Sequence, residues 1–143
     1  MIRVVLDTNV LVAALLTPAG NPAQLVEAVR SHQLAPAYSS AILTEYKEVL
    51  ARPKFGFTPE EIQGLIQLIQ SVGTGIEPHP ALSKSIPLSP DPDDNHVILC
   101  AVASQAEYIV TGNAKHFPLS AYGSARVMQP REMLEELRTR GFP

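Results

Sequence analysis

Hydrophobic residues follow two spacings along the chain. Residues 2–6 read Ile-Arg-Val-Val-Leu, a nearly continuous apolar run that is typical of a strand covered on both faces in a parallel sheet. Similar short runs occupy residues 34–38, 108–111 and 126–128. Segments that read as helices, most of them with apolar residues at helical spacing, lie between and after these runs, at residues 10–16, 23–32, 42–50, 59–69, 92–104 and 130–139. Strands that alternate with helices predict a three-layer α/β/α sandwich around a mostly parallel sheet of four or five strands.

Local signals indicate where some of these elements begin. Thr58 offers a hydroxyl cap, Pro59 a first helical residue, and Glu61 the third position after the cap, so a capping box is expected there. Ser39 or Ser40 can cap the preceding helix. Residues 78–92 are rich in Pro and Ser, and this composition predicts a loop with no more than a short edge strand near residues 86–88.

Length and composition favour one small protein domain. A chain of 143 residues with 45% hydrophobic residues can bury most of its surface around one core, so we expect a single domain over residues 1–143. The beginning of the chain carries no pattern of a signal peptide or membrane span, which predicts a cytoplasmic protein without membrane contact. The single cysteine, Cys100, lies in an apolar run; it predicts core packing and excludes an internal disulfide or a cysteine-based zinc site.

Four polar side chains stand at or near the ends of the expected elements. Asp7 follows the first strand, Glu45 lies in an apolar helix pattern, Asp94 follows the Pro-rich loop, and Asn113 follows the strand at 108–111. In an open parallel sheet, ligands bind beyond the carboxyl ends of the strands. Carboxylates that gather there without cations must bind metal, take up protons or repel one another. The pattern therefore predicts a divalent-metal site.

Each of these residues also has a simpler interpretation. Asp7 could be a turn residue or the cap of the next helix, and its neighbours Thr8 and Asn9 could serve equally as that cap. Glu45 could lie at the solvent edge of its helix, although the positions three and four residues away hold no cation to pair with it. Asn113 could cap the segment that follows it. As a ligand it would add no charge, so a second metal ion would bind more weakly.

The acidic cluster at residues 91–94 contains two candidate ligands. Asp91 can cap the following helix, with Pro92 as its first residue. Asp94 has Val97 and Ile98 behind it at helical spacing, which favours an inward orientation. We therefore expect Asp94 to be the ligand, with Asp91 as the alternative, and Asp93 to face water or support the site from outside.

Net charge does not by itself indicate a nucleic-acid partner. The chain holds 11 Lys and Arg against 14 Asp and Glu, for a formal charge of −3, whereas many nucleic-acid-binding domains are strongly basic. A metal pocket changes this picture, because bound cations reverse the local sign of an acidic cluster. The histidines show no metal-ligand spacing, and no Gly-x-Ser-x-Gly or Gly-rich phosphate loop is present, which disfavours serine hydrolases and nucleotide-binding proteins.

Four segments resemble the successive motifs of PIN-domain proteins. They are Val-Leu-Asp-Thr-Asn-Val-Leu at 5–11, the helix at 40–50, Asp-Pro-Asp-Asp-Asn at 91–95 and Ile-Val-Thr-Gly-Asn at 109–113. The resemblance spans nearly the whole chain and is closest to the small prokaryotic type known as toxins of toxin-antitoxin pairs. It implies that Asp7, Glu45 and Asp94 are the catalytic metal ligands. Asn113 occupies a position often held by Asp, Thr111 lies beside the site, and Asn9 steadies Asp7.

The same resemblance implies an activity and partners. Mg²⁺ or Mn²⁺ would activate water for attack on an RNA phosphodiester, and single-stranded or looped RNA is the expected substrate. Such toxins usually form homodimers and are blocked by an antitoxin protein. The alternative is a non-catalytic RNA-binding or scaffolding PIN-like protein. A metal-dependent phosphatase is disfavoured, because the second acid of the common aspartyl-phosphate type is missing two residues after Asp7.

Overall fold

A six-stranded sheet forms the centre of the computed structural model, which describes residues 1–141 except for the side chain of Asp93. The strand order is β3-β2-β1-β4-β6-β5, and every neighbouring pair is parallel except β5 and β6. The strands are β1 (Ile2–Leu6), β2 (Leu34–Tyr38), β3 (Thr74–Gly75), β4 (Tyr108–Val110), β5 (Ala121–Tyr122) and β6 (Ala125–Met128).

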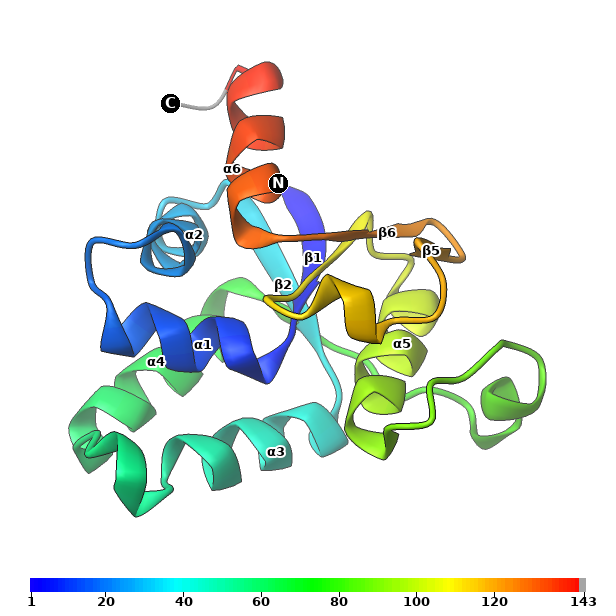
Figure 1. The fold of residues 1–143 in the computed structure, drawn as a ribbon, viewed down its shortest axis with the longest axis horizontal. Coiled ribbons are helices and arrows are strands. Elements are labelled where there is room, and N and C mark those ends of the chain that lie inside the picture. The colour runs from blue at the N-terminus through cyan, green and yellow to red at the C-terminus, as the bar shows by residue number, and fades with distance from the viewer. Residues whose placement is uncertain (142–143) are drawn as a thin grey trace.

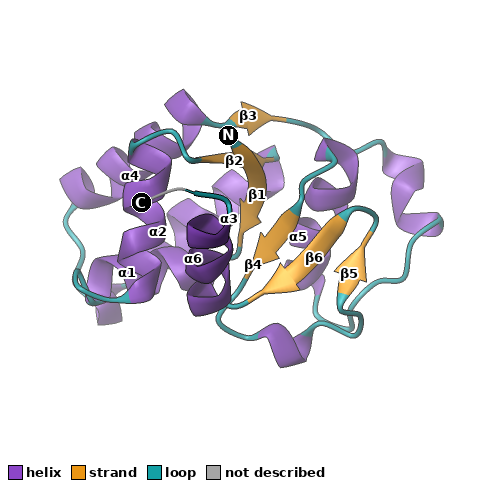
Figure 2. Cartoon of the chain, turned by 90° about the horizontal axis from the view of Figure 1, so that it is seen from above, coloured by secondary structure: helices purple, strands orange, loops and turns teal. Residues whose placement is uncertain are grey.

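Helices cover both sides of the central strands (Figure 1). The α-helices are α1 (Thr8–Leu16), α2 (Asn21–Arg30), α3 (Ser40–Leu50), α4 (Pro59–Val72), α5 (Pro92–Ser104) and α6 (Pro130–Thr139). Three short 3₁₀ helices are η1 (Pro53–Phe55), η2 (Pro80–Lys84) and η3 (Ala114–His116). Figure 2 shows α1, α2 and α6 grouped on one side of the sheet, whereas α5 packs against β1, β2 and β4 from the other side. No helix within residues 1–141 is long and apolar enough to span a membrane.

The predicted fold class is confirmed, with one difference in strand number. The expected sheet had four or five strands, and the structure adds the two-residue strands β3 and β5. Neither two-residue segment is long enough to show an apolar pattern in the sequence. Each forms through backbone pairing with a longer strand, β3 with β2 and β5 with β6. Gly73 lets the chain return to the sheet edge: a Cβ at this position would lie 2.1 Å from the carbonyl oxygen of Pro36.

The predicted edge strand at residues 86–88 is wrong. These residues belong to no strand, and the loop before them forms the 3₁₀ helix η2 instead. Proline alone does not explain this, since β2 contains Pro36. Among the described residues the sheet ends at β3 and β5, and neither of these strands pairs with residues 86–88.

Helix starts follow the capping signals of the sequence. The predicted capping box is confirmed, because the Thr58 hydroxyl accepts from the Glu61 amide at 3.1 Å and the Glu61 carboxylate accepts from the Thr58 amide at 3.0 Å. Ser39, not Ser40, caps α3 by accepting from the Ile42 amide at 3.2 Å. Helices α1 and α2 each begin two residues earlier than expected, at Thr8 and Asn21.

Removing the Thr58 hydroxyl should destabilise the protein measurably. We expect Thr58→Ala to lower the free energy of unfolding by about 1 kcal/mol, since it leaves an orphan amide at the start of α4. Urea unfolding followed by circular dichroism measures this loss. Thr139→Ala is the control, because that exposed hydroxyl only bonds a carbonyl inside α6. Equal losses in the two variants would contradict the capping role.

Buried strands bring the expected site residues to one edge of the sheet. Val4, Leu6, Ile109 and Val110 are all fully buried, and Cys100 is buried as predicted. The register pairs Leu6 with Val110, so the next residues, Asp7 and Thr111, emerge side by side. The Asp7 amide donates to the Val110 carbonyl at 2.9 Å and continues the ladder to that point.

Candidate metal-binding site

Asp7 is both the cap of α1 and a buried acid at the end of β1. Its Oδ1 accepts from the Thr8 amide at 2.8 Å, which is the capping role considered from the sequence. Only 9% of the residue is exposed. The cap uses one carboxylate oxygen and turns the other, Oδ2, toward the end of β4.

Thr111 and Asn9 hold the second oxygen of Asp7. The Thr111 hydroxyl donates to Oδ2 at 2.8 Å, and the Asn9 amide donates to the same oxygen at 3.1 Å. Asn9 also reaches the Thr111 hydroxyl at 3.3 Å and accepts from the Gly112 amide at 2.8 Å. This network joins the carboxyl ends of β1 and β4, and it fixes the orientation of the Asp7 carboxylate.

The environment of Asp7 opposes its ionisation. Burial raises the pKa of Asp7, and the negative charge of Asp91 raises it further. Hydrogen bonds from Thr111, Thr8 and Asn9 lower this pKa, but the net shift is upward. The ionised form of Asp7 is therefore disfavoured even though three groups donate hydrogen bonds to it. A nearby cation would stabilise that ionised form.

Asp94 lies in the first turn of α5, and its surroundings also raise its pKa. Desolvation is the largest cause of this rise, and the charges of Asp7 and Asp91 add to it. A hydrogen bond from the Ser89 hydroxyl, at 3.3 Å, and the nearby His116 act in the opposite direction. Within residues 1–141, no ion pair with Lys or Arg involves Asp7 or Asp94. Acidic groups from distant parts of the chain therefore share one region.

The two candidates in the acidic cluster differ in exposure. Asp94 is half-buried and Asp91 is exposed, and both acids interact electrostatically with Asp7. The backbone carbonyl of Asp91 accepts from the Asn95 amide at the start of α5. The side chain of Asp93, which we expected to face water or support the site, lies outside the described residues.

Glu45 is connected to the site through Thr8. It is half-buried on α3, and its carboxylate accepts a hydrogen bond from the Thr8 hydroxyl. Thr8 is the residue directly after Asp7, so this contact brings Glu45 next to the β1–α1 junction. The sequence favours a metal ion as the partner of an inward-facing Glu45. In the structure, the Thr8 hydroxyl donates to this carboxylate.

Asn113 follows the same edge of the sheet but is more exposed. Its backbone amide donates to the Thr111 hydroxyl at 3.1 Å, which ties it to the Asp7 network. The residue precedes η3, but its side chain makes no capping hydrogen bond to that helix. The amide side chain is thus available to a ligand while contributing no charge.

The donor atoms fit a hard divalent cation better than zinc. Asp7, Asp94 and Glu45 offer carboxylate oxygens, and Asn113 offers an amide oxygen, which are ligands that Mg²⁺ and Mn²⁺ prefer. Among the described side chains, no three His, Cys, Asp or Glu residues are gathered closely enough to bind one ion. Mg²⁺ commonly uses one or two carboxylates and keeps several waters. Asp7 and Asp94 are the two carboxylates that would serve as direct ligands in such an arrangement.

Two hydroxyl contacts in this region were missed by sequence reasoning. Thr8 donates to Glu45, and Ser89 donates to Asp94. Thr8 was considered only as a helix cap, and Ser89 lies in a loop without periodicity. The Thr8 contact spans 37 positions, so no local spacing could reveal it.

Basic residues lie unevenly around the site. Lys115 and His116 are exposed on η3, directly after Asn113. Lys54 lies beyond the carboxyl end of α3, where its ammonium group is 5.1 Å from the centre of the Phe55 ring. Lys115 follows Asn113 by two residues, and Lys47 follows Glu45 by two residues on α3.

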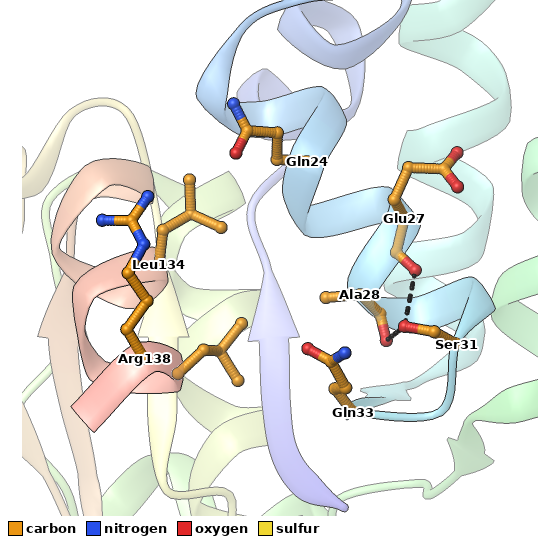
Figure 3. Close-up of a pocket in the computed structure, with 8 residues that line it drawn as sticks. Gln24, Glu27, Ala28, Ser31, Gln33, Leu134 and Arg138 are labelled. Carbon is orange, nitrogen blue, oxygen red and sulfur yellow. Dashed lines mark hydrogen bonds between the residues drawn. The ribbon is translucent and has the colours of Figure 1, made fainter. Parts of the chain in front are cut away.

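A separate groove between α2 and α6 contains none of the predicted site residues (Figure 3). Its volume is about 400 Å³, and Ser31 within it donates to the carbonyl oxygens of Glu27 and Ala28. The groove is lined by Gln24, Glu27, Ala28, Ser31, Gln33, Leu134, Leu137 and Arg138. The groove is not lined by a cluster of acidic side chains, so the candidate metal-binding site remains the one at the ends of β1 and β4.

The raised pKa values of Asp7 and Asp94 predict a pH dependence of stability without metal. The folded state holds these protons more tightly than the unfolded state, so their contribution to folding stability is lost as pH rises through the folded-state pKa values. We expect Asp94→Asn, which cannot ionise, to gain stability relative to wild type as the pH rises above about 4, the ordinary pKa of an aspartate.

Urea unfolding in the presence of a chelator measures this difference at each pH. The control is Glu60→Gln, which removes an exposed carboxylate from the first turn of α4. A stability difference between Asp94→Asn and wild type that is independent of pH would contradict the proposed electrostatic environment.

Comparison with known proteins agrees with the architecture. A chain in the crystal structure of VapBC2 from Rickettsia felis bound to a DNA fragment from their promoter is 20% identical to this chain and superposes with a TM-score of 0.53. The match covers 90% of this chain and 98% of that chain, and at this identity it shows a shared fold. No curated protein sequence matches significantly. A family profile described as PIN domain matches residues 3–115. The chain therefore belongs to the PIN domain family.

Proposed function

We propose that this protein is a metal-dependent endoribonuclease. The observation that carries the proposal is the electrostatic interaction between Asp7 and Asp94: the charge of Asp7 raises the pKa of Asp94, and neither carboxylate has a Lys or Arg partner among the described residues. Such an arrangement is stabilised by a divalent cation. Membership in the PIN domain family supports a nuclease over other uses of this site.

The side chains of the site have distinct tasks in this proposal. Asp7, oriented by Thr111 and Asn9, and Asp94 would hold Mg²⁺ or Mn²⁺, and Glu45 would support the ion directly or through water. The bound ion supplies activation of water and neutralisation of phosphate charge. No side chain of the protein needs to act as a nucleophile. Asn113 adds a neutral oxygen, so one ion is held more firmly than a second.

RNA with unpaired nucleotides is the proposed substrate. Asp7 stands at the start of α1 and Asp94 in the first turn of α5, and Asp7 is only 9% exposed, so a phosphate would have to approach a largely buried carboxylate. A single strand or loop exposes its backbone to such a site better than a duplex does. Lys115 and His116, exposed on η3, are suited to contact flanking phosphates.

We also propose that the protein is the toxin of a toxin-antitoxin pair and forms a homodimer. The support is the shared fold with a chain of the VapBC2 complex together with the PIN domain match. A partner protein encoded beside this chain should form a stable complex with it and suppress RNA cleavage. Size-exclusion chromatography with light scattering measures both the complex and the expected dimer of the free protein.

The activity is tested with purified protein and defined nucleic acids. Single-stranded RNA, duplex RNA and single-stranded DNA of one sequence are incubated with Mg²⁺, with Mn²⁺ or with a chelator. We expect internal cuts in single-stranded RNA only when an ion is present, and restored cutting when the chelator is saturated with Mn²⁺. Cleavage that persists in the chelator contradicts the metal-dependent mechanism.

A second candidate is a non-catalytic RNA-binding protein. Asn113 in place of an acid favours it, as does the lack of a three-ligand cluster among the described side chains. RNA binding without cleavage in either ion would support this candidate. Hydrolysis of an aryl phosphate without RNA cleavage would instead indicate a phosphatase.

A further inference from the structure

Two hydrogen bonds connect α3 to the residues on either side of Asp7. The Tyr46 hydroxyl donates to the carbonyl oxygen of Leu6, and the Thr8 hydroxyl donates to the carboxylate of Glu45. Glu45 and Tyr46 are consecutive on α3, and Leu6 and Thr8 flank Asp7. Figure 1 shows α3 running beside α1, and the two helices are in contact.

Tyr46 is placed to act on the backbone of the site. Only 1% of the residue is exposed, so its hydroxyl needs a partner inside the protein. The ladder between β1 and β2 pairs Ile2, Arg3 and Val4 of β1 but does not extend to Leu6. Tyr46 therefore satisfies a carbonyl that lies beyond that ladder, one residue before Asp7.

The Tyr46 hydroxyl donates to a carbonyl inside the protein. A hydroxyl can donate one hydrogen bond, and the Leu6 carbonyl is the acceptor it reaches from its buried position on α3. The contact therefore links α3 directly to the end of β1.

We propose that Tyr46 is a positioning residue, whose hydroxyl holds α3 against the end of β1 so that Glu45 and Asp7 keep a fixed separation at the metal site. The inference rests on the proposed metal-dependent function. Outer residues that orient metal ligands typically contribute 10–100-fold to metal affinity or activity. Tyr46 acts through the backbone, and we expect an effect of about tenfold, at the lower end of that range.

The test compares Tyr46→Phe with Tyr108→Phe. Each change removes one hydroxyl from a buried tyrosine. Tyr108 is 4% exposed, and its hydroxyl accepts from Arg140 at 2.8 Å, where β4 begins. Because the site lies at the carboxyl end of β4, this control perturbs the sheet at its opposite end. Both variants should lose some stability, so thermal unfolding is measured for each.

Three readouts distinguish positioning from packing. Titration calorimetry gives the Mn²⁺ affinity, steady-state kinetics give kcat and KM for single-stranded RNA, and hydrogen exchange in the metal-free protein reports on the amides of Asp7 and Thr8. We expect Tyr46→Phe to bind Mn²⁺ about tenfold more weakly, to lower kcat with KM unchanged, and to exchange these two amides faster. Tyr108→Phe should match wild type in all three.

The outcomes separate this inference from the proposed function. Wild-type Mn²⁺ affinity and amide exchange in Tyr46→Phe would overturn the positioning role, as would equal losses in both variants. If the wild-type protein neither binds Mn²⁺ nor cuts RNA, the proposed function is wrong, and the hydrogen bond from Tyr46 to Leu6 has no role in catalysis. Amide exchange would then still decide whether Tyr46 holds the β1–α1 junction.

Discussion

Asp94→Asn should lower the rate of RNA cleavage by at least about 100-fold, because loss of a direct metal ligand should exceed the 10–100-fold typical of outer residues. The change removes one charge with little change in shape. Asp94 is a cleaner target than Asp7, since an asparagine at position 7 would place its amide against the amide of Asn9, which now donates to Asp7. The Ser89 hydroxyl near Asp94 can donate or accept.

Cleavage rates at saturating Mn²⁺, measured with labelled single-stranded RNA, test this expectation. Glu60→Gln is the matched control, because it also removes one negative charge but lies on the exposed first turn of α4. Thermal unfolding without metal should show that Asp94→Asn is at least as stable as wild type. Cleavage by Asp94→Asn at the wild-type rate would remove Asp94 from the site and favour Asp91 instead.

Thr111→Val should affect both stability and cleavage. The buried Thr111 hydroxyl donates to Asp7 and accepts from the Asn9 side chain and the Asn113 amide. Valine has nearly the same shape but removes three hydrogen bonds, while Asn9 still donates to Asp7, and we expect a loss of about 2 kcal/mol in the free energy of unfolding. Because Asp7 then loses part of its fixed orientation, cleavage should fall by about 10- to 100-fold.

Urea unfolding and cleavage kinetics measure these two losses. Thr111→Ser is the rescue variant, since it keeps the hydroxyl and deletes only a methyl group. We expect it to recover most of the cleavage rate even though it leaves a small cavity. If Thr111→Ser is as inactive as Thr111→Val, the methyl contact rather than the hydrogen-bond network is what matters.

Continuous core patterns made the central strands and most helices predictable. The apolar run at residues 2–6 became β1, and Thr58 with Glu61 formed the expected capping box. The strands β3 and β5 were not predictable, because two residues pair through backbone atoms of a neighbouring strand. The expected edge strand at 86–88 did not form, because among the described residues the sheet ends at β3 and β5 and neither pairs with that segment.

Long-range hydrogen bonds from hydroxyl groups are the part of the candidate site that the sequence could not predict. The position of Asp7 after a buried strand indicated that it would lie at the sheet edge, and the parallel register places Thr111 beside it. The contacts of Tyr46 with Leu6 and of Thr8 with Glu45 join residues 40 and 37 positions apart. Such contacts depend on how α3 packs against the β1–α1 junction, which no local sequence pattern encodes.

The central claim is that Asp7 and Asp94 share one divalent cation. Anomalous scattering from Mn²⁺-soaked crystals tests it most directly, because it locates the ion independently of the protein atoms. We predict a peak about 2.0–2.3 Å from an oxygen of each carboxylate, with Glu45 within reach of a water bound to the ion. Mn²⁺ bound elsewhere at full occupancy, with no peak between Asp7 and Asp94, would contradict the claim.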